Sequence, residues 1–132
     1  MQPHRLRLVK DIRGDLLAGE FQRDIPFAPK RYFLVFYVPI CETCVGHAHR
    51  TCHQFLICPP GSCDILLDNG LRRRQLTIKT PDVGVYVPAM AWGTQFRYSA
   101  DAMLLVFASE YYDPEDSIRS YAEFRALTLA QT

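Results

Sequence analysis

One stretch decides the fold: Gly46-His47-Ala48-His49, with the apolar run Phe55-Leu56-Ile57-Cys58 and the turn Pro59-Pro60-Gly61 after it. Two histidines at positions i and i+2 point to the same face of a strand, because successive side chains alternate across the pleat. Sharp turns on either side indicate a small β-barrel with both imidazoles directed into its mouth. Two histidines facing one cavity suit either proton transfer or metal ligation. The alternative is that both are polar residues on an exposed strand face.

The composition is that of one globular domain spanning residues 1–132. The chain is 48% hydrophobic and 12% aromatic, and it is long enough to bury a core without disulfides or metals. A net charge of +1 gives no whole-molecule attraction for nucleic acid or membrane. No apolar run is long enough to span a bilayer, and the N-terminus lacks a signal-peptide core. We therefore expect a cytoplasmic protein that has neither a nucleic-acid nor a membrane partner.

The cysteine count argues against a secreted scaffold. Five cysteines are an odd number without the density of a disulfide framework, so reduced thiols are expected. Cys58 and Cys63 lie in expected core strands and are interpreted as small buried hydrophobic residues.

Alternating polar and apolar residues between turn residues predict about ten short strands. Asp68-Asn69-Gly70 is interpreted as a hairpin turn, since Asn-Gly supplies positive φ angles. Regular spacing of short strands favours an all-β, double-sheet jelly-roll or related barrel. The expected strands are residues 5–9, 16–18, 31–38, 55–58, 63–67, 74–78, 83–87, 92–98 and 103–108, with the histidine stretch between the third and fourth.

Only the C-terminal tail is predicted to be helical. Asp113 is a good N-cap and Pro114 fits the first helical position. Glu115 and Asp116 complement the positive end of the helix dipole. One apolar face for docking on the barrel follows at i, i+3 and i+6: Ile118, Tyr121 and Phe124.

The same residues resemble a known family. His47-Ala48-His49, Gln54 and Gly61 follow the first cupin motif, and within the cupins the chain is similar to the sugar-nucleotide 3,4-ketoisomerases that act on dTDP-4-keto-6-deoxyhexoses. The likeness runs from about residue 8 to residue 125. The supporting segments are Asp11-x-Arg13-Gly14, Ile25-Pro26-Phe27, Lys30-Arg31, Gly46-His47-Ala48-His49-Arg50, Gly61-Ser62-Cys63, Leu67-Asp68-Asn69-Gly70, Gly84-Val85-Tyr86-Val87-Pro88, Met90-Ala91-Trp92 and Ala108-Ser109-Glu110-Tyr111-Tyr112-Asp113.

The resemblance implies a jelly-roll (cupin) homodimer with exchanged N-terminal strands, a dTDP-linked keto-deoxysugar as substrate, and an active site without metal or other cofactor. The residues support the metal-free site independently. Gln54 occupies the position of the carboxylate ligand of a cupin metal centre, and Gly93 follows Trp92 where a further histidine ligand is wanted. Two imidazoles and a neutral amide are a poor site for most divalent metals.

The expected chemistry is proton transfer through an enediolate. Moving a ketone from C4 to C3 of a hexose removes the C3 proton and then protonates C4, which one base of near-neutral pKa can do. A second group stabilises the enediolate oxygens. We assign the proton shuttle to His49 and the orienting or oxyanion-stabilising role to His47, with the reverse assignment left open.

Further residues are candidates for binding the substrate. Arg13 resembles the arginine that meets the diphosphate in related proteins, and guanidinium geometry suits phosphate oxygens. The alternative for the other arginines is surface solvation, and for the lone tryptophan it is a place in the core. The substrate-binding candidates are Arg13, Arg31, Arg50, Gln54, Trp92 and Tyr32.

Three departures from the family pattern leave alternatives open. Cys44 and Gly93 stand where arginine and histidine are common in the family. Phe33 replaces a tyrosine, and a phenol remains only next door at Tyr32. The alternatives are a catalytically silent sugar-nucleotide-binding protein and an epimerase of a related keto-sugar.

A zinc site is the rival interpretation of the cysteines. Cys41-x-x-Cys44-x-x-His47-x-His49-x-x-Cys52-His53 has a zinc-like spacing. Strand alternation, however, sends Cys52 and His53 to opposite faces.

Overall fold

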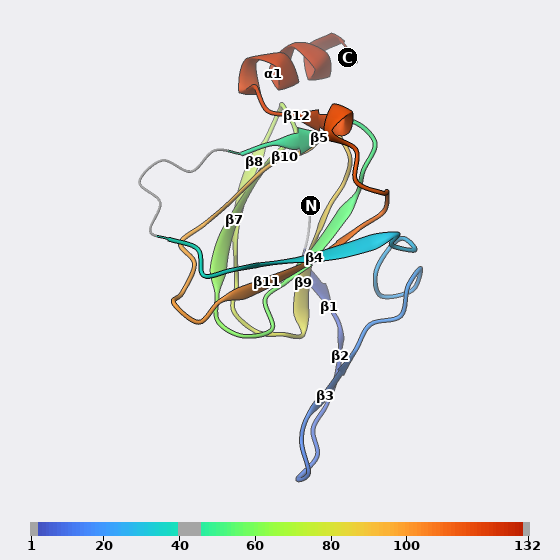
Figure 1. Cartoon of the computed structure of the whole chain (residues 1–132), viewed down its shortest axis with the longest axis vertical. Coiled ribbons are helices and arrows are strands. Elements are labelled where there is room, and N and C mark those ends of the chain that lie inside the picture. The colour runs from blue at the N-terminus through green and yellow to red at the C-terminus, as the bar shows by residue number, and fades with distance from the viewer. Residues whose placement is uncertain (1–2, 40–45, 131–132) are drawn as a thin grey trace.

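The computed structural model describes residues 3–39 and 46–130 as an all-β molecule with one α-helix. The strands are β1 (Pro3–Arg5), β2 (Arg7–Val9), β3 (Leu16–Ala18), β4 (Arg31–Phe36), β5 (Ala48–His49), β6 (Gln54–Ile57), β7 (Cys63–Asp68), β8 (Arg73–Ile78), β9 (Val83–Val87), β10 (Trp92–Phe96), β11 (Met103–Ala108) and β12 (Ser117–Ile118). All their pairings are antiparallel. The larger sheet has the order β1-β9-β6-β11-β4 and the smaller one β10-β7-β8, while β12-β5 and β2-β3 form short pairs (Figure 1).

The main core lies between the two larger sheets. Leu56 and Leu104 from the five-stranded sheet and Ile65 from the three-stranded sheet are almost completely buried in one apolar cluster. Cys58 and Cys63 are buried there as free thiols, as predicted. Burial raises the pKa of Cys63 to about 12, so this thiol stays protonated. The expected double-sheet architecture is confirmed.

A second apolar layer lies on the outer face of the five-stranded sheet. Phe55 is buried there beneath Ile25, which belongs to the segment between β3 and β4. Farther along the same face, strand β4 is uncovered, and its outward side chains are exposed: Tyr32, Leu34 and Phe36. An exposed apolar stripe of this kind is typical of a surface that meets another protein.

The predicted strand 5–9 is wrong as a single element. Leu6 is buried in the outer apolar layer, and the chain divides around it, so β1 pairs with β9 while β2 pairs with β3. The β2–β3 hairpin extends away from the sheets, at the end of the molecule opposite the helix (Figure 1). Gly14, with a φ of 136°, is in its connecting loop, where Ile12 is fully exposed.

The β7–β8 hairpin is confirmed, and each strand extends one residue farther into the turn than predicted. Asp68 pairs directly with Arg73, which leaves four residues in the loop. Gly70 takes a positive φ of 95°. Asn69 contributes through its side chain, whose Oδ1 accepts hydrogen bonds from the backbone N–H groups of Leu71 and Arg72.

The prediction of one continuous C-terminal helix from Asp113 is wrong in its first part. Asp113 caps a single 3₁₀ turn, η1 (Pro114–Asp116), and the chain then extends as β12. The helix α1 begins only at Tyr121 (Tyr121–Ala130). Ile118 pairs with Ala48 of β5 and is fully buried. This strand pairing and burial outweigh the helix-starting signals, because tertiary packing routinely overrides local propensity.

The predicted docking face is nevertheless correct. Ile118 and Phe124 are fully buried and pack in one cluster with Trp92 and Tyr121. The α1 helix therefore lies against β12 and β10 at one end of the sheets (Figure 1). No helix in the described ranges has the length and apolar character needed to cross a membrane.

Candidate active site

His47 and His49 lie together at the end of the sheets covered by β5 and β12. Their rings are edge-on, with centroids 5.0 Å apart, as the i, i+2 spacing predicted. Two backbone hydrogen bonds with Gly93 hold the strand in place: the His47 N–H donates to the Gly93 carbonyl at 3.0 Å, and the Gly93 N–H donates to the His47 carbonyl at 2.9 Å.

Both histidines line a cavity of about 440 Å³, a size typical of small-molecule sites. Side chains from β4, β5, β6 and β12 converge on it, so it is built from strands that are far apart in sequence. Two of its residues, Arg31 and Arg119, bring positive charge. The lining residues are Arg31, Phe33, Gly46, His47, His49, Gln54, Tyr112, Ser117 and Arg119.

Both ring nitrogens of His49 have polar neighbours. Nδ1 lies 3.5 Å from Oδ2 of Asp116, and Nε2 lies 3.3 Å from the amide nitrogen of Gln54. An amide nitrogen only donates, so the Gln54 contact requires a lone pair on Nε2.

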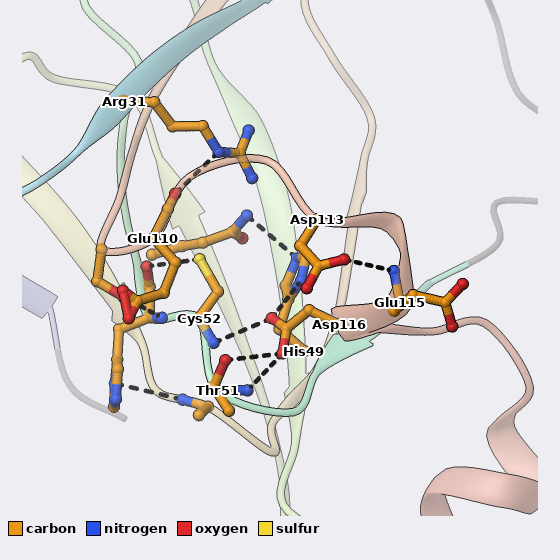
Figure 2. A network of polar contacts seen from close by, with 12 residues as sticks. Arg31, His49, Thr51, Cys52, Glu110, Asp113, Glu115 and Asp116 are labelled. Atoms are coloured by element: carbon orange, nitrogen blue, oxygen red, sulfur yellow. Dashed lines mark hydrogen bonds and ion pairs between the residues drawn. The ribbon is translucent and has the colours of Figure 1, made fainter.

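Asp116 is itself held by the turn that follows β5 (Figure 2). Its Oδ1 accepts hydrogen bonds from the backbone N–H and the hydroxyl of Thr51, both at 2.8 Å. Its Oδ2 accepts from the backbone N–H of Cys52 at 3.1 Å. Burial by itself would raise the pKa of Asp116, but these hydrogen bonds and His49 outweigh it and hold the pKa below its ordinary value. The carboxylate is therefore ionised at neutral pH.

The surroundings keep both histidines neutral. Burial lowers the pKa of His47, and repulsion from Arg119 and from His49 when His49 is protonated lowers it further. Burial also lowers the pKa of His49, where Asp116 opposes the shift without cancelling it and Arg31 adds to it. A buried imidazole that is neutral near pH 7 is suited to accept a proton.

Arg31 lies between the cavity and a neighbouring hollow. Its Nε donates a hydrogen bond to the Glu110 carbonyl at 3.1 Å, and its guanidinium lies over the rings of Phe33 and Tyr112. The neighbouring hollow, also about 440 Å³, shares Arg31, His49 and Tyr112 with the first. Lys30 and Tyr111 extend this hollow with a cation and a ring.

The other predicted binding residues differ in their placement. Gln54 is buried and lines the cavity. Trp92 is buried against Tyr121 of α1 and lines a separate hollow of about 310 Å³. Tyr32 is largely exposed on the face of β4 opposite Phe33.

Two predicted arginines do not line the histidine cavity in this chain. Arg13 is exposed at the far end of the β2–β3 hairpin, 3.3 Å from the Asp11 carboxylate. Arg50 lies in the turn after β5 and pairs with Glu123 of α1 at 2.8 Å. This pair joins the turn to the helix.

The sequence analysis gave no role to Tyr112, which lines the cavity, and it placed three further residues of the site in the predicted C-terminal helix. Asp116 was interpreted only as a helix-dipole residue. Ser117 and Arg119 flank Ile118, and this polar–apolar–polar alternation is the strand signal that identifies their shared face.

The zinc interpretation remains untested at its first two positions. Cys41 and Cys44 lie outside the described residues. Within the described part of the chain, no three His, Cys, Asp or Glu side chains are grouped to hold a metal ion. The Cys52 thiol donates to the His53 carbonyl at 3.4 Å.

Comparison of the sequence with known proteins identifies relatives over nearly the whole chain. A family model described as "FdtA: WxcM-like, C-terminal" matches residues 1–129. TDP-4-oxo-6-deoxy-alpha-D-glucose-3,4-oxoisomerase from Aneurinibacillus thermoaerophilus is 39% identical over 115 residues, which are 87% of this chain and 83% of that protein.

Solved structures are similar over almost their whole length. WlaRB, a TDP-quinovose 3,4-ketoisomerase from Campylobacter jejuni, is 36% identical with a TM-score of 0.88, covering 95% of this chain and 96% of its own. QdtA, a sugar 3,4-ketoisomerase from Thermoanaerobacterium thermosaccharolyticum in complex with TDP, is 32% identical with a TM-score of 0.91, covering 98% and 95%. A substituted form of QdtA in complex with TDP-4-keto-6-deoxyglucose is 31% identical with a TM-score of 0.91, covering 98% and 94%.

The family model thus spans nearly the entire chain, and the Aneurinibacillus relative shares more than a third of the aligned residues. The resemblance noted in the sequence is confirmed, and the chain belongs to the FdtA (WxcM-like, C-terminal) family.

Proposed function

We propose that this chain is a 3,4-ketoisomerase of a TDP-linked 4-keto-6-deoxyhexose. The observation that carries the proposal is the pair of neutral, edge-on histidines in a cavity that also holds two arginines. The names of its relatives support the same activity: three of them are called 3,4-ketoisomerases or oxoisomerases, and two structures contain TDP or a TDP-keto-sugar.

The reaction balances with proton transfers alone. A base removes the C3 proton, which the neighbouring C4 carbonyl makes acidic, and the C3–H electron pair forms a C3–C4 double bond. The C4 oxygen takes up a proton as the enediol forms. The C3 hydroxyl then loses its proton to become the ketone, and C4 is protonated. No redox partner is required, because the substrate and the product are isomers.

The contacts favour His47 as the carbon base. Asp116 and Gln54 face the two nitrogens of His49, whereas His47 lines the cavity edge-on to that ring. His49 then relays the proton between the C3 and C4 oxygens through Nε2, where the substrate oxygen replaces the Gln54 amide as the partner of the lone pair. This is the reverse of the first assignment made from the sequence, and it gives both imidazoles a role.

The diphosphate is the part of the substrate that needs positive charge. Arg31 borders both hollows, so it lies where the sugar in the first hollow meets the nucleotide in the second. Arg119 adds a second cation to the sugar cavity. Guanidinium groups suit phosphate oxygens because they donate two parallel hydrogen bonds.

A homodimer supplies Arg13 in this proposal. The exposed β2–β3 hairpin carries Arg13 away from its own histidines, and the uncovered stripe on β4 offers an apolar surface for a second copy. An exchanged N-terminal segment brings Arg13 of one protomer to the cavity of the other. A cytoplasmic location is also proposed, supported by the free thiols of Cys52, Cys58 and Cys63.

The direct test incubates the protein with TDP-4-keto-6-deoxyglucose and a 3-aminotransferase that traps the 3-keto product. The expected result is a 3-amino sugar only when this protein is present. His47→Ala and His49→Ala should each lower single-turnover isomerisation by more than about tenfold. Isomerisation within about tenfold of wild type for both variants would contradict the assignment of the histidines.

The same assay separates two alternative functions, a catalytically silent sugar-nucleotide-binding protein and an epimerase of a related keto-sugar. Phe33 brings no hydroxyl to the cavity and Gly93 no side chain, and these features favour a silent binding protein. That function would give tight TDP binding without turnover on any 4-keto sugar. An epimerase would instead return a 4-keto product with solvent deuterium at an inverted carbon.

A further inference from the structure

We infer that Asp116 is a positioning residue that fixes the ring proton of His49 on Nδ1 and so keeps the lone pair on Nε2, the nitrogen beside Gln54 in the cavity wall. The inference deepens the proposed function and rests on it for its kinetic readout only. Asp116 does not line the cavity of the two histidines, so its action passes through His49.

The carboxylate is built into the fold on the side of His49 away from Gln54. Thr51 and Cys52 together donate three hydrogen bonds to its two oxygens. The Arg50 N–H also donates to the Asp116 backbone carbonyl at 2.9 Å. The turn after β5 therefore wraps around the Asp116 residue and fixes Oδ2 at 3.5 Å from Nδ1 of His49.

Two contacts on opposite sides of the ring require the same tautomer. An ionised carboxylate only accepts hydrogen bonds, so it favours a proton on Nδ1. The Gln54 amide nitrogen at 3.3 Å only donates, so it favours a lone pair on Nε2. A base whose second nitrogen is oriented by a carboxylate is a recurring arrangement in enzymes that move protons.

The Asp116 carboxylate also lowers the free-energy cost of protonating His49. When His49 takes the proton of the C3 hydroxyl, it becomes an imidazolium with Asp116 as counter-ion. The ring of His47 lies edge-on to His49, and the positive charges of Arg31 of β4 and Arg119 disfavour the imidazolium. Asp116 is the one neighbour among these described groups that favours it.

The decisive variant is Asp116→Asn. Its carbonyl oxygen keeps the two bonds from Thr51. Its amide nitrogen replaces Oδ2, gives up the hydrogen bond from the Cys52 N–H and donates to Nδ1, which reverses the tautomer. The expected result is a kcat at least about tenfold lower with KM within about threefold. The acid limb of kcat/KM moves to lower pH because the anion that raises the His49 pKa is gone.

Glu115→Gln is the matched control, because it removes one negative charge from the same 3₁₀ turn at an exposed position. It should leave kcat, KM and the acid limb unchanged. Thermal melting of both variants separates loss of fold from loss of activity. An Asp116→Asn protein with wild-type kcat and acid limb would overturn the inference.

A second measurement does not depend on turnover. ¹⁵N NMR of histidine-labelled wild-type protein reports which nitrogen of neutral His49 carries the proton, and His49→Asn identifies its signals. We expect the proton on Nδ1 in wild type and on Nε2 in Asp116→Asn. A proton on Nε2 in wild type would disprove the inference. Failure of wild type to turn over any keto-sugar would reject the proposed function and leave this measurement valid.

Discussion

At the scale of single residues, the site depends on close packing around Gly46. This glycine lines both the histidine cavity and the smaller hollow beside Trp92. A Cβ at this position would collide with the Trp92 indole nitrogen, the Thr94 hydroxyl and the Gly93 carbonyl. The absence of a side chain at residue 46 therefore lets His47 approach β10 closely enough for its two backbone hydrogen bonds.

Gly46→Ala should destabilise the protein by about 1–3 kcal/mol, because the extra methyl group forces neighbouring side chains and backbone apart. Denaturant unfolding measures this difference. Gly93→Ala is the control: a Cβ there meets only ordinary contacts, with Leu67 at 3.5 Å and Gln95 at 3.7 Å. Its unfolding free energy should stay at the wild-type value or rise by up to about 1 kcal/mol, because alanine loses less backbone entropy on folding than glycine. Equal effects of the two substitutions would contradict this packing argument.

The pH dependence of activity is also set by single residues. Burial lowers the pKa of both His47 and His49 from the ordinary 6.5. Proton transfer requires their neutral forms, which persist to lower pH when the pKa is lowered. The acid limb of kcat/KM should therefore fall below pH 6.5 when measured from about pH 5 to pH 8. An acid limb of kcat/KM with its midpoint at or above pH 6.5 would mean that a different group controls activity.

At the scale of elements, β12 organises the site more than the helix does. Its two residues pair with β5, placing Ser117 opposite His49 and Ile118 opposite Ala48. The same short strand follows the 3₁₀ turn that carries Asp116. One element thus connects the cavity, the positioning carboxylate and the buried face of α1.

Ile118→Ala should cost about 2–5 kcal/mol of unfolding free energy, and Ile118→Val about 0.5–1.5 kcal/mol, since Ile118 is fully buried. The alanine variant should also lower kcat, because the β12–β5 register holds Asp116 against His49. Leu71→Ala, at a largely exposed apolar side chain, should change stability by less than about 0.5 kcal/mol. An Ile118→Ala protein as stable as wild type would show that β12 is not anchored by this side chain.

At the scale of the whole molecule, surface features of one chain point to a second copy. The hairpin with Arg13 extends from one end, and the exposed stripe of Tyr32, Leu34 and Phe36 lies on the outer face of the larger sheet. Exchange of identical segments between protomers is a low-cost route to a symmetric dimer.

Co-expression of Arg13→Ala and His47→Ala subunits tests the proposed exchange. Each variant alone should be inactive or strongly impaired. In a random mixture half of the dimers are heterodimers, and each of these contains one site with both native residues. Activity should recover to roughly a quarter of wild type. No recovery, with dimers confirmed by light scattering, would mean that Arg13 does not act on the partner's histidines.

The sequence by itself determined the two-sheet architecture and the placement of the two imidazoles on the same face of one strand. Strand alternation and Gly/Pro/Asn turns are local signals, so β9 and β11 begin and end where they were predicted, and His47 and His49 share a face. The family resemblance, confirmed over residues 1–129, followed from the same local motifs.

Only the tertiary structure decided where the tail and the arginines go. Ser117 and Ile118 form a strand because β5 offers them a partner and a buried place, and no local pattern outweighs that pairing. Arg50 pairs with Glu123, 73 residues away in sequence, and Asp116 reaches His49 across a similar separation. Such contacts depend on long-range packing, because the energy that selects them exists only once distant segments have met.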